Sequence, residues 1–381
     1  MKVPLSQCSF DAEVQEAVVR ALRSGQYILG KECDAFEAEL AAYTGTRHCV
    51  LGSSWTMCVF LLHQLQGLGP GDEVIVPSHT AFPTIEPLLQ RGARPVFVDV
   101  DDAYTLDLAQ IQAAISPRTV GIIPVHLYGH PVDMDRLQLI ATKYHLWVLE
   151  DCAQAQGAKY RNRRVGSMAD FGAFSFFPSK NLTVLGDGGC IATNDSQIAE
   201  RLRMLRNHGR KTKYEHEFAG YNARFNEINA AVGRLMLSRL DQANEHRRKI
   251  AACYRQQLKG LVRLPPEREW AEPVYHLFVI RCERRDELRQ FLKQRDIETG
   301  IHYPIPNHRQ LAVSQLFPVI PALSHTDALV NEILSLPMYG EMGLEAAHFV
   351  CDSIEEFYCG SREAPRLERA RAHPKACVES K

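Results

Sequence analysis

The 381-residue sequence contains no apolar run close to the roughly 20 residues that a membrane-spanning helix requires. Its first residues, MKVPLSQCSFDAE, lack the basic stretch and apolar core of a secretory signal. Charge of one sign is also missing, because 44 basic and 45 acidic side chains leave a formal net charge of -1. We therefore expect a cytoplasmic protein with no membrane association and no general attraction for nucleic acid.

The eleven cysteines include no C-x-x-C pair, and several lie in apolar segments, among them Cys49, Cys58 and Cys190. An odd number without metal-ligand spacing argues against a disulfide framework or a zinc site and favours reduced thiols. Internal repeats and low-complexity segments are absent too. The sequence is that of an ordinary globular protein, 45% hydrophobic and 23% charged, and it is long enough for two domains.

Strands and helices are predicted to alternate along most of the chain. Apolar segments of strand length lie at 48–51, 73–77, 95–100, 120–125, 146–149, 171–177 and 190–193. Helical patterns separate most of them, a pattern typical of right-handed crossovers and of a mainly parallel, doubly wound α/β sheet. After 190–193, helices are expected at 196–208, 225–242, 245–258, 286–294 and 326–334, with one further strand-like segment at 275–280.

The pattern changes near His246, which suggests a domain boundary. We predict a large cofactor-binding domain over residues 1–245 and a smaller α/β domain over 246–359, which residues 1–20 are candidates to join. The remainder, 360–381, is charged and poor in large apolar residues. It is expected to form a disordered tail.

The stretch 146–194 concentrates the groups that suggest chemistry. Asp151 directly follows one apolar strand, and Lys180 follows another, just before the turn Gly186-Asp187-Gly188-Gly189. Ligands of open α/β sheets bind at such strand ends. A lysine there can form a Schiff base with an aldehyde cofactor, and an aspartate can hold that cofactor's pyridinium nitrogen. These residues predict a pyridoxal-phosphate site.

Each of these residues also has a purely structural interpretation. The segment Ser53 to Thr56 turns from a strand into a helix, where free N–H groups favour a phosphate, but Ser54 is equally suited to capping the helix. Considered alone, Asp151 could be a helix cap or a surface charge, and Lys180 could be a solvated surface lysine. Gln154 and Ser175 are candidates for hydrogen bonds to the ring's phenolic oxygen and to the phosphate, or for structural roles.

Taken together, these segments resemble a known family. From about residue 4 to residue 350 the chain is similar to the sugar aminotransferases of the DegT/DnrJ/StrS type, which are fold-type I enzymes dependent on pyridoxal phosphate. The matching segments, in the same order, are GQYILGKECDAFEAELAAYTGTRHCV, GPGDEVIVPSHT, GARPVFVDVD, IIPVHLYGHPVDMD, EDCAQAQGA, GAFSFFPSKNL, GDGG, GYNARFNEINAAV, GIHYPIP and LSLPMY.

The resemblance implies roles for the cofactor-binding residues. Lys180 would attach the cofactor as a Schiff base, Asp151 would pair with the pyridine nitrogen, and Gln154 would lie near the phenolic oxygen. The phosphate would be held by the amides around Ser54 and Trp55 and by the side chains of Thr56 and Ser175.

The resemblance also implies a homodimer with composite active sites. Asn222 would reach the phosphate in the other subunit, with Arg224 beside it. His302 and Tyr303 of the small domain, together with Tyr27, would lie on the substrate side.

Two positions depart from the family pattern. Trp55 stands where the family usually has Gly before the phosphate-loop threonine. Ala81 stands where an aromatic residue usually stacks on the pyridine ring, so Phe82 and His79 are the candidates for that contact. Relatives that dehydrate their substrate carry His at the position of Lys180, which favours an aminotransferase here.

The implied function is transfer of the amino group of L-glutamate to the keto group of a nucleotide-linked (dTDP, UDP or GDP) deoxy-keto-sugar, giving an amino sugar. One alternative is a glutamine-dependent aminotransferase of keto-cyclitols, as in aminoglycoside pathways. Another, of a different class, is a non-catalytic regulatory protein that binds pyridoxal phosphate. The presence of Lys180, Asp151 and Gln154, and the lack of a basic patch, argue against the last.

Overall fold

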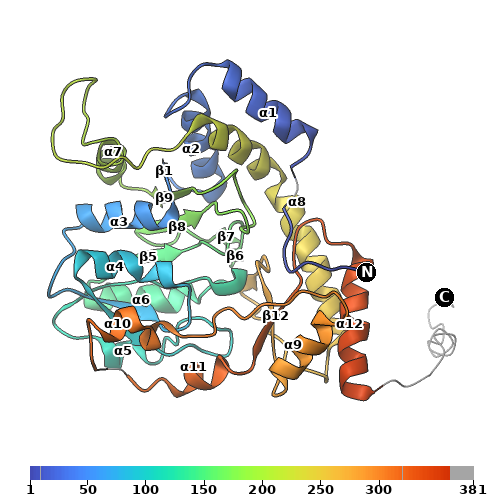
Figure 1. Ribbon diagram of the computed structural model, residues 1–381. Coiled ribbons are helices and arrows are strands. Elements are labelled where there is room, and N and C mark those ends of the chain that lie inside the picture. Colours follow the sequence, from blue (N-terminus) through green and yellow to red (C-terminus); the bar gives the residue numbers. More distant parts are fainter. Residues whose placement is uncertain (9, 320, 361–381) are drawn as a thin grey trace, which may run out of the picture.

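The computed structural model describes residues 1–8, 10–319 and 321–360. A seven-stranded sheet lies at the centre of the larger part, in the order β1-β9-β8-β5-β4-β2-β3 (Figure 1). Its strands are β1 (His48–Gly52), β2 (Glu73–Pro77), β3 (Arg94–Val98), β4 (Thr119–Ile122), β5 (Trp147–Asp151), β8 (Phe171–Ser175) and β9 (Gly189–Thr193). Only β9 runs against the others. The expected mainly parallel α/β sheet is confirmed.

Helices cover both faces of this sheet, as the strand sequences require. They are α2 (Lys31–Thr44), α3 (Trp55–Leu65), α4 (Glu86–Arg91), α5 (Ile111–Ala114), α6 (Met134–Tyr144) and α7 (Ser196–Leu205). In β2, Val74 and Val76 belong to the core cluster that contains Leu62 of α3, whereas Ile75 joins the cluster of Leu137 of α6. Alternate residues of one strand are thus buried on opposite faces, which explains the continuous apolar runs.

A second core lies toward the C-terminus. Strands β11 (Phe278–Arg281) and β12 (Ile333–Leu336) pair antiparallel, and α9 (Arg285–Lys293) and α12 (Leu344–Cys359) pack beside them. Val3 is buried in the same cluster and forms a bridge with Ile297. The residues around Val3 therefore contact this C-terminal core.

One long helix links the two cores. Helix α8 (Glu227–Gln257) runs for 31 residues, where the sequence had suggested two helices broken near residue 244 (Figure 1). Asparagine is generally unfavourable in the interior of a helix. Here the side chain of Asn244 is buried and donates to Gln156 O at 2.8 Å. Because α8 crosses residue 245, the division into domains at that residue stays a prediction.

Other elements differ from the prediction at the C-terminal end. The helix expected at 326–334 is wrong, since α11 (Ser324–Leu329) ends early and β12 follows. Helix α12 was not predicted, and α10 (Leu311–Ser314) is a single short turn. Apart from Gly360, the tail predicted over 360–381 lies outside the described residues.

A small sheet and one helix lie at the periphery. Strands β6 (Lys159–Tyr160), β7 (Arg163–Arg164) and β10 (Ala271–Glu272) form a small separate sheet, and α1 (Ala12–Arg23) packs on α8 through Ala17 and Ala21. Within the residues that the structure describes, no helix combines the length and the apolar character needed to cross a bilayer.

Candidate active site

Lys180 and Asp151 come together at one edge of the sheet. Asp151 ends β5, and Lys180 lies five positions after the end of β8, its parallel neighbour. Although Lys180 keeps some accessible surface, desolvation by the surrounding protein lowers the pKa of its amine to about 8, and the charge of Asp151 partly opposes this shift. The lysine is therefore closer to a neutral, nucleophilic amine than a surface lysine is.

Asp151 is a buried carboxylate, with 3% of its surface exposed. Burial raises its pKa, while hydrogen bonds from Ala153 N (3.0 Å) and Thr84 Oγ1 (2.9 Å) and the charge of Lys180 act in the other direction. Among the described residues, no ion pair includes Asp151. Such a carboxylate favours a cationic ligand group beside it.

Gln154 joins the sheet to a C-terminal segment. Its Oε1 accepts from Tyr128 N at 2.8 Å, and its Nε2 donates to the hydroxyl of Tyr303 at 2.9 Å. The Tyr128 hydroxyl in turn donates to the carbonyl oxygen of His302 and lies 2.6 Å from Nε2 of His79. Gln154, His302 and Tyr303, all predicted site residues, are thus connected in one polar network.

His79 and Phe82, the two candidates for stacking on the ring, differ in environment. His79 is fully buried, its Nδ1 has no partner among the described residues, and burial lowers its pKa to about 3. Its ring centroid lies 6.3 Å from that of Tyr303. Phe82 is only partly buried and packs against the main core cluster. His79 is therefore the candidate that belongs to the polar network.

The N-terminus of α3 lies against the start of β9. A Cβ built on Gly189 would fall 2.6 Å from Trp55 N, so glycine permits this close approach. Ser54 caps the helix by accepting from Met57 N at 3.1 Å, which is the structural role considered for it. Among the described residues, the Thr56 hydroxyl has no hydrogen-bond partner and remains free to bind a ligand.

Trp55 fits this position because its side chain is buried in the core. The residue belongs to the cluster of Cys58 and Leu62, and its indole Nε1 has no partner among the described residues. Ser175, the other predicted phosphate ligand, is buried at the end of β8, and its hydroxyl accepts weakly from Phe177 N at 3.4 Å.

Three predicted residues are not brought into contact with Lys180. Arg224 Nε donates to Asn222 Oδ1 at 3.0 Å, and Asn222 is exposed. Tyr27 is 53% exposed, and its carbonyl accepts from Glu227 N at 2.9 Å. These side chains lie on accessible surface, where a second subunit or a substrate can meet them.

The structure adds residues that the sequence had not singled out. Thr84 holds Asp151, and Tyr128 connects Gln154 with His79 and His302. Both lie in segments quoted for or adjacent to the family resemblance, but neither residue type marks a site by itself. Only the fold shows that they converge.

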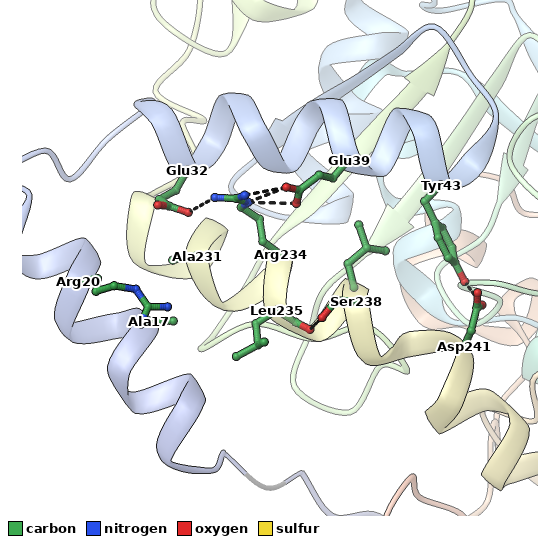
Figure 2. Close-up of a pocket in the computed structure, with 11 residues that line it drawn as sticks. Ala17, Arg20, Glu32, Glu39, Tyr43, Ala231, Arg234, Leu235, Ser238 and Asp241 are labelled. Atoms are coloured by element: carbon green, nitrogen blue, oxygen red, sulfur yellow. Dashed lines mark hydrogen bonds and ion pairs between the residues drawn. The ribbon is translucent and has the colours of Figure 1, made fainter.

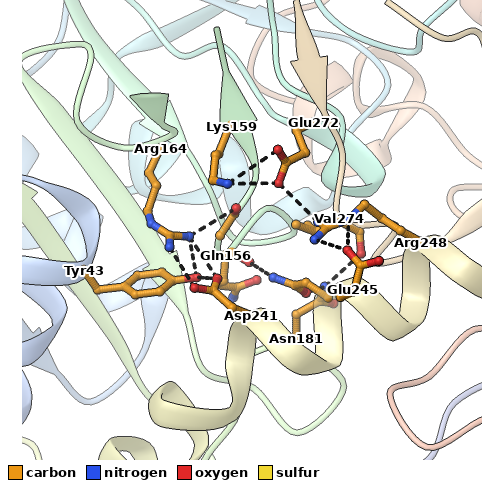
Figure 3. A network of polar contacts seen from close by, with 12 residues as sticks. Tyr43, Gln156, Lys159, Arg164, Asn181, Asp241, Glu245, Arg248, Glu272 and Val274 are labelled. Carbon is orange, nitrogen blue, oxygen red and sulfur yellow. Dashed lines mark hydrogen bonds and ion pairs between the residues drawn. The ribbon is translucent and has the colours of Figure 1, made fainter. Parts of the chain in front are cut away.

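The residue after Lys180 is anchored on three sides. Asn181 Nδ2 donates to Asn244 Oδ1 (2.8 Å) and to Val274 O (3.1 Å), and Asn244 reaches on to the backbone of Gln156. Asn181 Oδ1 also lies 3.2 Å from Nδ1 of the buried His276. Figure 3 shows Asn181 and Val274 near the ion pair of Arg164 with Asp241. The network fixes the loop that carries Lys180 against α8.

Two other polar clusters contain none of the predicted site residues. A hollow of about 600 Å³ between α1, α2 and α8 contains none of the predicted catalytic residues, and Arg234 bridges Glu32 and Glu39 across it (Figure 2). His126, Glu150 and Cys152 place potential metal-ligand atoms within 4.8 Å of one another. Glu150, however, already accepts from His126 and from the amides of the turn at 166–169.

Comparison with known proteins places this geometry in context. Residues 9–355 match the model of the DegT/DnrJ/EryC1/StrS aminotransferase family. A Streptomyces venezuelae protein named dTDP-3-amino-3,4,6-trideoxy-alpha-D-glucose transaminase is 45% identical over 349 residues, covering 91% of this chain and 92% of its own. The erythromycin biosynthesis sensory transduction protein EryC1 of Saccharopolyspora erythraea is 44% identical over 347 residues, covering 90% and 95%.

A solved structure agrees in three dimensions. The crystal structure of S. venezuelae DesV in complex with a ketimine intermediate superimposes with a TM-score of 0.90 at 43% identity, covering 95% of this chain and all of DesV. The chain therefore belongs to the DegT/DnrJ/EryC1/StrS aminotransferase family.

Proposed function

We propose that the protein is a pyridoxal-phosphate-dependent aminotransferase that converts a nucleotide-linked deoxy-keto-sugar into an amino sugar. The observation that carries this proposal is the Lys180 amine beside the buried Asp151 carboxylate, at the ends of two adjacent parallel strands. The transaminase name of the 45% identical Streptomyces venezuelae relative supports the same reaction and a dTDP-linked sugar.

The side chains present fit this cofactor. Asp151 is buried without a cation in contact among the described residues, and a protonated pyridine nitrogen supplies one. The free N–H groups at the start of α3, together with Thr56, suit a phosphate, and Gly189 keeps the approach open. Bound pyridoxal phosphate supplies an electron sink and carries the amino group between substrates.

The residues of the chain then have distinct tasks. With the cofactor bound, Lys180 would take and return the proton of the substrate Cα, and a pKa of about 8 makes its amine a suitable base and acid. Asp151 keeps the ring nitrogen protonated, and Thr84 holds Asp151 in place. Gln154 lies near the phenolic oxygen, with Tyr303 bound to its amide.

The remaining roles concern the phosphate, the substrates and the assembly. Ser54, Trp55, Thr56 and Ser175 hold the phosphate, and His302, Tyr303 and Tyr27 line the substrate side. L-Glutamate is the proposed donor. Asn222 and Arg224 act across a homodimer interface, and the protein works in the cytoplasm.

A second candidate function is suggested by the name of one relative. The printed name of EryC1 describes sensory transduction, which fits a regulatory protein that binds the cofactor without turnover. Lys180 would attach the cofactor in either case, and the transaminase name of the Streptomyces venezuelae relative favours catalysis. A glutamine-dependent keto-cyclitol aminotransferase shares all of these residues and differs only in its substrates.

The visible absorption spectrum tests the proposal. The band of cofactor attached to Lys180 should disappear when L-glutamate is added and reappear with a dTDP-linked keto-sugar. Lys180→Ala should still bind pyridoxal phosphate but lose turnover, by at least about 1,000-fold, since it loses the proton carrier. Transamination retained in that variant contradicts the assignment. A response to glutamine alone supports the cyclitol alternative, and no response to either donor supports a regulatory role.

A further inference from the structure

Arg247 of α8 is a buried arginine without an acidic partner in contact. It is 6% exposed, and its Nη1 donates to the carbonyl oxygens of Tyr275 (3.3 Å) and Met338 (3.1 Å). No ion pair among the described residues includes it. Burial lowers the pKa of its guanidinium to about 10. A desolvated cation in this position gains most from an anion that enters beside it.

Such an anion has a place to enter. A cavity of about 290 Å³ is lined by both Arg247 and Lys180, together with Asn181 and Glu341. Asp151 and Gln154, which face the cofactor in the proposed function, are not among its lining residues. The cavity is therefore separate from the ring-binding residues and meets them at Lys180, the group that reacts.

The charges around the cavity are mainly positive. His276 is buried, and the positive charges of Lys180 and Arg247 add to the burial that lowers its pKa well below the usual value. The His276 imidazole is thus neutral, and burial and Lys180 lower the pKa of His302 as well. Glu341 is the opposing charge on the cavity wall, and it raises the pKa of Arg247 only in part.

We propose that Arg247 binds the α-carboxylate of the amino-acid donor while the donor's amino group reacts beside Lys180. This inference rests on the proposed aminotransferase function. A guanidinium matches a carboxylate through two parallel N–H···O bonds.

The diphosphate of a nucleotide sugar shares this anionic chemistry, but it is bonded to the anomeric carbon and not to the keto carbon. The α-carboxylate, in contrast, is bonded directly to the carbon whose proton Lys180 moves. A buried cation in the cavity that Lys180 lines therefore fits the amino acid better.

The test removes first the charge of the donor's α-carboxylate and then the charge of Arg247. The donor half-reaction is followed by the loss of the cofactor band with L-glutamate and with its α-amide, isoglutamine. Arg247→Gln should lower kcat/KM for glutamate by about 100-fold, as for a buried charge pair broken on one side. The same variant should change kcat/KM for isoglutamine by less than about threefold, because that donor lacks the carboxylate.

Two controls separate the possible sources of the effect. Arg248→Gln changes the next residue of the helix, which pairs with Glu245 and Glu272, and should leave both donors unchanged. The acceptor half-reaction, of the pyridoxamine form with a dTDP-linked keto-sugar, should also be unchanged in Arg247→Gln. A loss confined to the acceptor half-reaction would show that Arg247 binds the diphosphate and would overturn the inference.

Binding and a second variant guard against misfolding. Calorimetric titration of the pyridoxamine form with glutarate, an unreactive dicarboxylate, should give a Kd at least about tenfold weaker in Arg247→Gln. If that variant does not fold, Arg247→Lys serves instead, since it keeps a charge but loses the planar fork. Equal use of glutamate by wild type and variant refutes the role of Arg247. A wild type that ignores every donor refutes the aminotransferase proposal instead.

Discussion

Two opposing effects meet at the Lys180 amine. Burial destabilises its charged form, and the neighbouring Asp151 carboxylate stabilises it. The first effect is larger, so the net pKa, about 8, lies below the ordinary 10.5. Lys180 therefore becomes neutral within a pH range in which a surface lysine is still almost fully protonated.

This shift predicts how the apoprotein takes up its cofactor. Only the neutral amine attacks the aldehyde, so the attachment rate should rise about tenfold per pH unit below the pKa and level off near pH 8. Stopped-flow absorbance measures the rate. In Asp151→Asn the plateau should begin at a lower pH, because the carboxylate that raises the lysine pKa is gone. A plateau reached only near pH 10.5 in wild type would contradict the desolvated site.

Sequence reasoning singled out Asp151 and Lys180 but not the residues that position the groups around them. Asp151 and Lys180 follow apolar strands, so local pattern alone marked them. Thr84 bonds to Asp151 from 67 residues away, and Tyr128 bonds to His79 from 49 residues away. Threonine and tyrosine occur in most segments of any protein, and no local signal distinguishes these two.

Among the elements, the first residue of α8 fixes the start of α2. The N-cap of α2 is Gly30, which has no side chain to cap with. The carboxylate of Glu227 accepts instead from the amides of Gly30 (2.7 Å), Glu32 (2.9 Å) and Cys33 (3.0 Å). Burial raises the pKa of Glu227, but the hydrogen bonds from Cys33 and these amides outweigh it, and the pKa is lowered.

Replacing this carboxylate should destabilise the protein. Glu227→Ala should lower the free energy of unfolding by about 2–3 kcal/mol, because it leaves buried amides without an acceptor. Since the folded pKa is lowered below the usual 4.5, this stability is present above that pH and is lost as the pH falls through the folded value. Urea unfolding of wild type and Glu227→Gln should therefore differ most at neutral pH. A difference that grows with acid would contradict the cap.

Element boundaries were predictable where a segment contains its own signal. The strand predicted at 73–77 matches β2. Its three central residues, Val74 to Val76, are apolar toward both faces of the sheet, and a turn precedes the segment. Ile333 and Leu334 were assigned to the end of a helix, yet Ile333–Leu336 pairs with Phe278–Arg281, a partner that no local window contains. The predicted break in α8 failed for a similar reason, since Asn244 is accommodated by Asn181 and Gln156.

At the scale of the whole molecule, the proposed composite site makes a quantitative prediction. Lys180→Ala and Asn222→Ala homodimers should each be inactive or nearly so. Mixing and reassociating the two chains should restore about a quarter of wild-type activity, because half of the dimers are hybrids with one intact site. Activity after mixing is compared with that of each variant alone. No recovery would show that Asn222 serves the site of its own chain.

Helix α8 also has a mechanical consequence. It begins at the cap of α2, passes the anchor of the lysine loop at Asn244, and ends in the C-terminal core with Tyr254. A continuous helix that is held at both ends and at its middle resists bending. Rotation of one core against the other would have to bend α8 beside the loop that carries Lys180. We therefore expect the spacing between the Lys180 amine and Arg247 to stay constant while surface loops move around the site.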